Sequence, residues 1–549
     1  MWAQGYDPFG NAVVSTLTAA IPVVVLLGSI AFLKLKAHVA ALLGIASSLA
    51  IAIFAFQMPA GMATLAAAFG AAYGLMPIGW IILNVIFLYR LTEQRGQFRI
   101  LQDSIASITP DRRLQLLLIA FGFGAFFEGA AGFGTPVAVT GAMLIGLGFS
   151  PLAASGLSLI ANTAPVAFGA LGTPVLALSS VTGLDVHELS GMIGRQLPFF
   201  AVIVPFWLIC AFAGWRGMLQ IWPAVLVAGV SFAVPQFLVS NFHGPWLVDI
   251  IAAICSMGVL TLFLRAWRPA SIWRSTKRGG DPDAQLSGEP GATEYTSEQI
   301  FRAWLPWLVL SVCVFLWGIP QVKAWLDSLF TLSLPVHGLH QLVQKVPPVV
   351  ATATAESAIY NFNVLSMTGS GILLAAVISS VLMKFSVREF FREYVATLLV
   401  VRWSLLTIAA MLALGYVTRY SGADATMGLA FAQTGWLYPL FGTMLGWLGV
   451  ALTGSDTASN VLFGGLQRIT SEQLGLNPVL MAAANSSGGV MGKMIDAQSI
   501  VVASTATKWY GHESEILRYV FFHSVALALL VSLLVLGQAY VWPLSALVH

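Results

Sequence analysis

The chain has 549 residues, of which 58% are hydrophobic and 9% are charged, and its mean hydropathy is +0.84. Soluble domains carry about 25% charged residues, so this composition excludes a water-soluble enzyme. The formal net charge is +3 and the basic residues are dispersed along the chain, which argues against a nucleic-acid partner. The expected partner surface is therefore the lipid bilayer.

Apolar stretches of about 20 residues, the length that crosses a bilayer, recur from one end of the chain to the other. Uninterrupted stretches predict membrane-spanning helices at 14–33, 38–56, 62–89, 195–214, 220–240, 246–266, 303–319, 368–384, 394–418 and 517–542. Two further blocks, 113–180 and 436–506, are apolar but are interrupted by Gly, Pro, Thr, Ser and Asn. Because irregular backbone inside a membrane must be buried in protein or line a cavity, we expect broken helices or re-entrant hairpins there. The predicted fold class is an all-α integral membrane protein of about 12–14 helical segments.

The most hydrophilic segment, 268–300, divides the chain. Its glycine, proline and charged residues are typical of a solvated linker. We therefore expect a first transmembrane half at 1–267, which contains the broken block 113–180. A second transmembrane half is expected at 301–549, which contains the broken block 436–506.

Lysine and arginine mark the cytoplasmic loops of membrane proteins. They collect after the first predicted span, at Lys34 and Lys36, and again after the third span, within the linker and at 384–392. The loops near Met58 and Asn241 contain few of them. This pattern predicts a cytoplasmic linker and places both chain termini on the outside.

Each half contains the same arrangement of polar residues within its broken block. In the first half, Glu128 in FFEGAAGFGTPVA is followed 34 residues later by Asn162 in ANTAPVAFGALGTPV. In the second half, Asp456 in LTGSDTASN is followed 29 residues later by Asn485 in ANSSGGVMGKMIDAQS. The spans that precede the two blocks cross the membrane in opposite directions under the predicted orientation. Paired interruptions in two inverted repeats are typical of transporters whose binding site lies near the middle of the membrane.

Glu128 and Asp456 are the predicted proton-coupling residues. A carboxylate buried in a membrane is costly and is by default a functional candidate, because burial favours its protonated form and a nearby anion changes its charge. The alternative for Glu128 is a structural acid that accepts hydrogen bonds from the backbone of the neighbouring glycines. Asp456 is flanked by hydroxyl residues, so a helix cap or part of a sodium site is its alternative role.

Two pairs of polar residues are predicted to bind the substrate. Asn162 with Thr163, and Asn485 with Ser486, precede segments rich in alanine and glycine. A helix N-terminus carries unpaired N–H groups and a partial positive charge, so two such ends facing each other would hold a small carboxylate. Helix capping without a ligand is the alternative.

Lys493, in GGVMGKMID, is a basic residue embedded in the second broken block. It either neutralises a substrate carboxylate or forms a salt bridge to Asp496, and the sequence does not separate these interpretations. Gly132, Thr453 and Ser455 lie in the same interrupted stretches and complete the predicted substrate-binding set. The three cysteines lie in apolar runs without metal-ligand spacing, so no metal site and no cofactor besides the coupling proton is expected.

The sequence resembles the lactate permease family in these motifs. The similarity extends along the chain, through GQFRILQDSIASITPDRRLQ (96–115), EGAAGFGTPVA, NTAPVAFGALGTP, FGTMLGWLGVALTGSDTASN (441–460) and ANSSGGVMGKMIDAQSI. The resemblance implies a multi-pass protein of the bacterial inner membrane that imports L-lactate, and related 2-hydroxymonocarboxylates such as glycolate, by proton symport. It also implies inverted repeats with hairpins, alternating access, and a homodimer of the kind often found among related ion transporters.

Two other functions stay open. One is a sodium-coupled carrier for glycolate or another small acid, and the other is a channel for small anions. A channel needs no pair of buried acids, which favours a carrier. No GxxxxGK[ST], HExxH or GxSxG motif occurs, so the sequence supports neither ATP-driven transport nor hydrolysis, and we do not expect an enzyme.

Overall fold

The computed structural model describes residues 1–548, with gaps at 32, 34, 131, 133–134, 274–294, 351 and 510–511. Within this part of the chain the structure is mostly helical. Most of the predicted linker 268–300 lies outside the described residues, as does Lys34.

The helices of the first half are interrupted at several π-helical and 3-10 turns, which are labelled η. Their bounds are α1 (Ala12–Ala31), α2 (Ala37–Ala50), η1 (Ile51–Ala55), α3 (Ala60–Tyr73), η2 (Gly74–Gly79), α4 (Trp80–Gln94), α5 (Gln97–Ala106), α6 (Arg112–Leu116), η3 (Leu117–Phe123), α7 (Gly124–Ala130), α8 (Thr135–Gly146), α9 (Pro151–Ala161), η4 (Val166–Phe168), α10 (Gly169–Thr182), α11 (Val186–Ile193), α12 (Leu197–Leu219), α13 (Trp222–Phe242) and α14 (Val248–Ala266).

The second half contains the remaining helices and most of the strands. The helices are α15 (Ser297–Gly318), α16 (Pro320–Leu329), α17 (Thr368–Leu382), α18 (Val387–Ser421), α19 (Ala423–Phe431), η5 (Ala432–Leu437), α20 (Tyr438–Thr453), α21 (Asp456–Gln473), α22 (Pro478–Gly492), α23 (Ala497–Ala506), α24 (Glu513–Tyr540) and η6 (Leu544–Leu547). The strands are β1 (Trp2–Ala3), which belongs to the N-terminus, and β2 (Leu332–Pro335), β3 (Val343–Lys345), β4 (Thr354–Ala355) and β5 (Ile359–Phe362).

Nine helices of the described residues are long and apolar enough to cross a membrane, and a tenth span arises if one bent pair is counted. The bent pair joins Pro151–Ala161 to Val166–Thr182 at 64°. Each of the ten uninterrupted stretches predicted from the sequence overlaps a helix. Those at 14–33 and 368–384 are among the shorter apolar helices, and η2 divides the stretch 62–89. The predicted helical membrane architecture is therefore confirmed.

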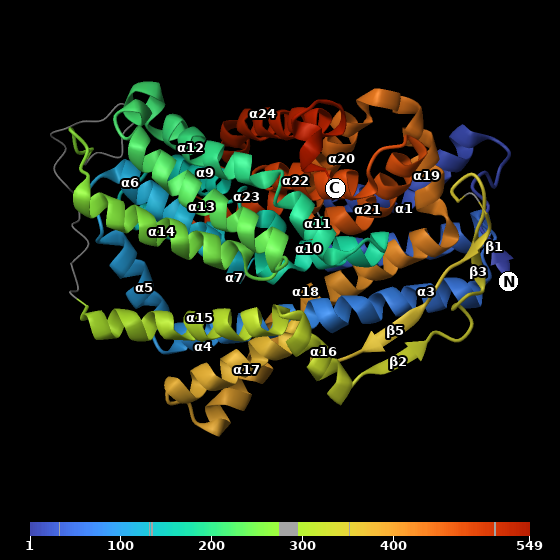
Figure 1. Ribbon diagram of the computed structural model, residues 1–549, viewed down its shortest axis with the longest axis horizontal. Helices are drawn as coiled ribbons and strands as arrows, with labels where there is room; N and C mark the ends of the chain where they lie inside the picture. The colour runs from blue at the N-terminus through green and yellow to red at the C-terminus, as the bar shows by residue number, and fades with distance from the viewer. Residues whose placement is uncertain are drawn as a thin grey trace.

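Two small sheets add β-structure that the sequence analysis did not predict. β1 pairs in parallel with β3, which pairs antiparallel with β4, and β2 pairs antiparallel with β5. These strands are two to four residues long, too short to show the alternation of polar and apolar residues that predicts a strand. In Figure 1 they lie at the opposite end of the molecule from α5 and α6.

Each broken block folds as two packed helices followed by an interrupted helix. In the first half α7 packs against α8, and α9 continues into α10 through the 64° bend. In the second half α20 and α21 pack against each other on either side of Gly454 and Ser455, and residues 493–496 separate α22 from α23. Both blocks are thus interrupted twice.

The two halves interlock at these interruptions. α10 of the first half packs against α21 of the second, and α23 of the second half packs against α8 and α9 of the first. Figure 1 shows α10 and α21 beside each other in the upper part of the molecule. The reciprocal packing brings the four interruptions to one place.

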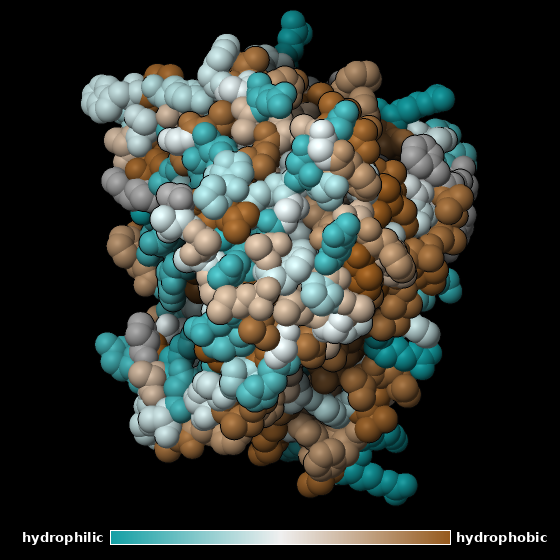
Figure 2. Space-filling view, turned by 90° about the vertical axis from the view of Figure 1, so that its right-hand side faces the viewer, coloured by the Kyte–Doolittle hydropathy of each residue, from teal (hydrophilic) through white to brown (hydrophobic). Residues whose placement is uncertain are grey.

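Long helices form a second layer beside the interlocked blocks. α18 packs against α3 and α4, and α17 packs against α4 and α15, along the lower side of Figure 1. Large hydrophobic side chains remain exposed on outer helices, such as Val381 on α17 and Phe522 on α24, as expected of surfaces that face lipid. Figure 2 looks onto the end that carries the sheets, where polar side chains cover the centre and hydrophobic ones gather along the right-hand side.

Candidate functional site

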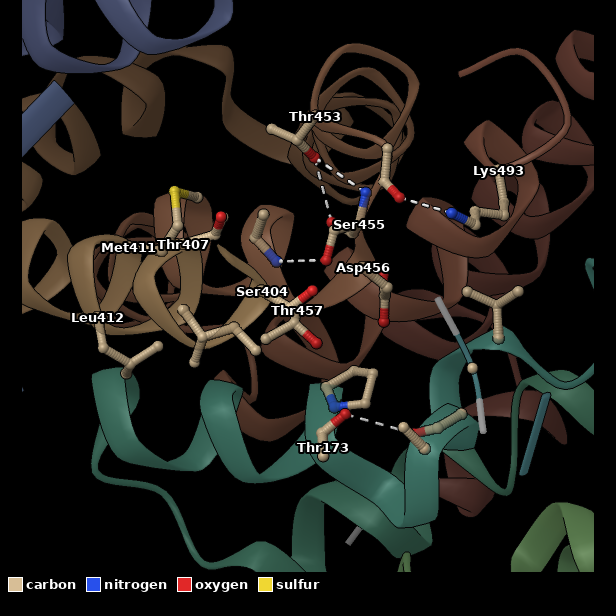
Figure 3. A pocket seen from close by; sticks show the side chains of 18 of the residues that line it. Thr173, Ser404, Thr407, Met411, Leu412, Thr453, Ser455, Asp456, Thr457 and Lys493 are labelled. Carbon is tan, nitrogen blue, oxygen red and sulfur yellow. Dashed lines mark hydrogen bonds between the residues drawn. The ribbon is translucent and has the colours of Figure 1, made fainter. Parts of the chain in front are cut away.

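A cavity of about 140 Å³ lies where the four interruptions meet. Its walls come from α7 and α10 of the first half and from α18, the α20–α21 tip and Lys493 of the second. Figure 3 shows hydroxyl side chains and Asp456 gathered around it. A cavity of about 150 Å³ accommodates a benzene-sized molecule, so this one suits a ligand of only a few atoms.

The tip between α20 and α21 is fixed by its own hydrogen bonds (Figure 3). Gly454 has a φ of 73°, in the left-handed region that favours glycine. The Ser455 hydroxyl caps α21 by accepting a hydrogen bond from the Ala458 N–H at 3.3 Å. The Thr453 hydroxyl accepts from the Ser455 N–H at 3.3 Å and donates to the Gly449 carbonyl at 2.7 Å. The first turn of α21, from Asp456 to Ala458, therefore lines the cavity.

Asp456 is the first residue of α21 and is buried. Its Oδ2 accepts hydrogen bonds from the Ser486 hydroxyl and, at 3.3 Å, from Nδ2 of Asn460. Its Oδ1 has no hydrogen-bond partner among the described residues. A Cβ at Gly489 would lie 2.4 Å from Oδ1, so glycine is required there. One oxygen is thus held in place, and the other is left for a proton or a ligand.

Glu128 reaches the same cavity from α7 of the first half. It is 4% exposed, and its Oε2 has no hydrogen-bond partner within the part of the chain that the structure describes. A Cβ at Gly169, the first residue of α10, would lie 2.4 Å from Oε1. Oε2 of Glu128 therefore accepts no hydrogen bond from the neighbouring glycines. Such bonds were expected if Glu128 were a purely structural acid.

Lys493 caps the C-terminus of α22 and lines the cavity. Its Nζ donates a hydrogen bond to the Gly454 carbonyl at 2.5 Å and lies 3.5 Å from Oδ2 of Asp496. Asp496 also accepts a hydrogen bond from the Ser499 N–H, which fixes it at the start of α23. The salt bridge that the sequence analysis left open is formed. An ammonium group has three N–H donors, so one more is left for an anion in the cavity.

Four of the predicted substrate-binding residues do not line the cavity. Of the two helix N-termini expected after them, that of α10 forms at Gly169 and lines the cavity, whereas none forms after Asn485. Asn162 is the C-terminal cap of α9, and the Thr163 hydroxyl donates to the carbonyl of Ile160. Asn485 and Ser486 lie in the middle of α22. The helix continues there because α20 packs directly against it: a Cβ at Gly446 would lie 2.1 Å from the Asn485 carbonyl oxygen.

Three of these residues, Asn162, Asn485 and Ser486, instead lie close behind the acids. Asn485 donates a hydrogen bond to the side chain of Asn460 at 2.9 Å, and Asn460 bonds Asp456. Ser486 bonds Asp456 directly. Asn162 lies near Glu128, although neither of its amide atoms has a partner with hydrogen-bond geometry among the described residues. Of the ten predicted site residues, those that line the cavity are Glu128, Gly132, Thr453, Ser455, Asp456 and Lys493.

The sequence analysis missed the wall that α18 provides. Ser404, Thr407 and Met411 line the cavity from this helix, and Thr173 lines it from α10. Figure 3 shows the α18 side chains on the side of the cavity opposite Lys493. A signal for them exists in the sequence, because Ser404 and Thr407 are hydroxyl residues three apart, hence on one helical face, inside a predicted span.

Comparison with known proteins assigns the chain to a family. The family model described as L-lactate permease matches residues 15–542. The chain belongs to this family. The glycolate permease GlcA of Escherichia coli (strain K12) is 48% identical over 551 residues, which cover 98% of this chain and 98% of that protein. The L-lactate permease of the same strain is 45% identical over 546 residues, again with 98% of each chain covered.

Among solved structures, that of the antimetabolite efflux pump MtrF of Neisseria gonorrhoeae aligns with 86% of this chain and 82% of its own. The sequence identity is 12% and the TM-score is 0.45, a similarity too low to support a conclusion about this chain. The family membership confirms the resemblance seen in the motifs. It makes the chain a multi-pass membrane transporter and not an enzyme.

Proposed function

We propose that this permease imports L-lactate, and related 2-hydroxymonocarboxylates such as glycolate, by proton symport with alternating access. The names of its relatives, glycolate permease and L-lactate permease, support the substrate class. The cavity supports it as well, because lactate has as many non-hydrogen atoms as benzene, which fits a cavity of about 150 Å³.

The observation that carries the proton coupling is the balance of charge in the cavity. Glu128 and Asp456, one from each half, have an oxygen without a partner, and Lys493 is the cation among the described lining residues. That cation is already paired with Asp496. Adding a monoanion beside two ionised carboxylates would be strongly unfavourable in a desolvated site. The anion therefore binds together with at least one proton, which needs no other cofactor.

The substrate contacts follow from the same geometry. The carboxylate of the substrate takes the remaining donor of Lys493 and the first turn of α21, beside Thr453 and Ser455, where a helix N-terminus favours an anion. Gly132 lies on the wall from the first half. Asn485 and Ser486 act from behind, through the hydrogen bonds that hold Asp456. Asn162 and Thr163 end α9, and Asn162 lies near Glu128.

The arrangement in the membrane also belongs to this proposal. The halves 1–267 and 301–549 act as inverted repeats joined by the cytoplasmic linker 268–300, with both termini on the periplasmic side of a bacterial inner membrane. Alternating access then exposes the shared cavity to one side at a time. We expect two copies to associate as a homodimer, as in related ion transporters.

Uptake by proteoliposomes tests the proposed function. With lactate equal on both sides, an inward proton gradient is expected to drive uphill accumulation of labelled L-lactate, and glycolate is expected to compete. A sodium gradient at constant pH is expected to drive none. Accumulation with sodium alone would support the sodium-coupled carrier instead, and equilibration without accumulation under either gradient would support an anion channel.

A further inference from the structure

A second buried carboxyl, Asp249, lies next to Glu128 but is set back from the cavity. It belongs to the first turn of α14 and is 1% exposed. Neither of its oxygens has a hydrogen-bond partner within the described part of the chain. A buried carboxyl without partners is costly and inside a membrane is a functional candidate by default. The proposed substrate contacts do not account for it.

Asp249 is in direct contact with the helix that carries Glu128. α14 packs against α7, and a Cβ added at Gly129 would lie 2.7 Å from the Cβ of Asp249. The turn before α14 packs equally closely against α10, because a Cβ at Gly172 of α10 would lie 2.7 Å from Pro245. Asp249 is within electrostatic range of Glu128. The two carboxyls therefore form a coupled pair.

The cation near this pair, Lys493, acts on Glu128 across the cavity and is already paired with Asp496. Helices α10 and α13 and the turn η3, which pack against α14, carry no Asp, Glu, Lys, Arg or His residue, and α7 carries Glu128 alone. Two carboxyls in close range, beside a cation that is already paired with another acid, cannot both be ionised at low cost. The pair therefore keeps at least one proton, which either carboxyl can hold.

The turn between α13 and α14 supplies polar groups between Asp249 and the surface. His243 is half-buried, and its Nδ1 has no partner among the described residues. Its ring packs edge-on against Trp246 at 6.2 Å, and the buried Nε1–H of Trp246 also has no partner there. Buried polar atoms of this kind are typical binding positions for water. His243 is thus a titratable group in the turn that leads into α14, six residues before Asp249.

We propose that Asp249 is the proton relay of this permease, which receives a proton from solvent by way of the His243–Trp246 turn and passes it to Glu128. In the transfer the O–H bond of Asp249 breaks and an O–H bond forms on Glu128. The negative charge moves to Asp249 until solvent returns a proton to it. This inference rests on the proposed proton symport, since a sodium-coupled carrier needs no such relay.

The variant Asp249→Asn tests the relay in proteoliposomes by two assays. Lactate–lactate counterflow needs no net proton movement, whereas uptake driven by a pH gradient does. A positioned proton donor contributes about 10²-fold or more, so coupled uptake is expected to fall about tenfold or more while counterflow stays within about twofold of wild type. Asp249→Glu is expected to restore part of the coupled uptake. The matched control is Asp424→Asn, a buried aspartate of α19 outside the cavity, which is expected to change neither rate.

Three results would overturn the relay. The first is coupled uptake at the wild-type rate in Asp249→Asn, and the second is an equal loss of counterflow and coupled uptake in folded protein. The third is a failure of both Asp249→Asn and the smaller Asp249→Ser to fold, which would assign Asp249 a structural role. With any of these three results, the proposed symport is still supported as long as the wild-type protein accumulates lactate under a pH gradient. If the wild type itself does not accumulate lactate under that gradient, the proposed function fails, and the relay fails with it.

Discussion

The charged side chains around the cavity have unequal freedom to respond to a ligand. Lys493 and Asp496 are paired at 3.5 Å, and Asp456 is held through one oxygen by Ser486. Glu128 has no ion pair among the described residues and reaches the cavity from the other half. Under the proposed symport, we therefore expect a bound anion to change the protonation of Glu128 more readily than the positions of Lys493 and Asp456.

Removal of the Lys493 ammonium is expected to weaken substrate binding. Loss of one charged contact to a desolvated anion costs about 2–5 kcal/mol, so Lys493→Ala should bind L-lactate at least about tenfold more weakly, measured as the half-saturating concentration for counterflow. Lys323→Ala, on the exposed surface of α16, is the matched control and should bind normally. A collapse in folded yield with normal affinity in the residual protein would instead make Lys493 a structural partner of Asp496.

The hydroxyl of Thr407 is expected to recognise the 2-hydroxyl group of the substrate. It donates to its own helix at the Trp403 carbonyl, which leaves it free to accept a hydrogen bond in the cavity. One neutral hydrogen bond contributes about 0.5–1.5 kcal/mol, so Thr407→Val should raise the half-saturating concentration of L-lactate about two- to tenfold. Inhibition by propionate, which lacks the hydroxyl, should be unchanged.

The matched control for Thr407 is Thr418→Val on the same helix, because Thr418 bonds the Gly415 carbonyl and lies away from the cavity. An equal loss of affinity for lactate and propionate in Thr407→Val would show that this side chain shapes the cavity and does not read the hydroxyl.

The sequence was sufficient to predict the acids but not the whole wall around them. Glu128 and Asp456 stand out because a carboxylate in an apolar block is costly wherever the chain folds. The positions of Asn485 and Thr407 depend on packing between helices distant in the chain: Gly446 lets α20 contact α22, and α18 crosses the cavity from the other layer. The spacing of Ser404 and Thr407 marks one helical face in the sequence, but which cavity that face lines depends on these distant contacts.

Among the elements, the ion cluster at Glu356 joins the sheet segment to the end of α18. Glu356 lies 3.3 Å from Arg419 and is also paired with Lys345 of β3. Arg419 in turn donates to the Ser180 carbonyl of α10 at 3.0 Å. Burial raises the pKa of Glu356, but the charges of Arg419 and Lys345 outweigh it and hold the pKa below its usual value. The cluster thus ties three separate elements together.

The lowered pKa of Glu356 predicts a pH-dependent contribution to stability. A carboxyl whose folded pKa is depressed stabilises the fold above its unfolded pKa, and this stabilisation is lost as the pH falls through the folded pKa. Glu356→Gln should therefore lower the melting temperature of the detergent-solubilised protein at pH 7. The difference from wild type should shrink as the pH is lowered below about 4.3, the usual pKa of glutamate. A difference that is constant from pH 7 to pH 3 would contradict this assignment.

Elements differ in how far the sequence determines them. The ten uninterrupted spans are predictable because hydropathy alone selects a helix in lipid. The tip at Gly454 is predictable from local residue types, because glycine ends helices and serine caps them: Gly454 ends α20 and Ser455 caps α21. The pairing of Trp2 with Val343 is not predictable from the sequence. It joins the N-terminus to a segment of the second half, and the two strands are too short to show an alternating pattern.

For the whole molecule, the loop charges predict that the linker faces the cytoplasm. Ser287→Cys, in the linker, should be inaccessible to a membrane-impermeant thiol reagent in intact cells and become labelled after permeabilisation. Asn11→Cys, in the exposed segment before α1, is the matched control and should be labelled in intact cells. The reverse pattern would overturn the orientation and the direction of the two repeats.

The reciprocal packing of the halves makes coupling a property of the whole molecule. Glu128 is supplied by one half and Asp456 with Lys493 by the other, so the state of each acid depends on how the halves meet. Importing one monovalent anion against a membrane potential costs about 2.3 kcal/mol per 100 mV. In the proposed symport, one proton bound between the halves cancels that cost, and the cavity that would hold it is lined by residues of both halves.

The number of protons that enter with each lactate, measured in Glu128→Gln and Asp456→Asn, tests the central claim most directly. Wild-type proteoliposomes with a pH-sensitive dye inside should acidify as labelled L-lactate enters down its own gradient. In the variant of the coupling acid, lactate should still exchange across the membrane, but neither acidification nor uphill accumulation under a pH gradient should occur. Each acid has one oxygen without a partner among the described residues, but the other oxygen of Asp456 accepts hydrogen bonds from Ser486 and Asn460. Such bonds favour the ionised form, so we expect this result for Glu128→Gln. Wild-type acidification and accumulation in both single variants would contradict the account.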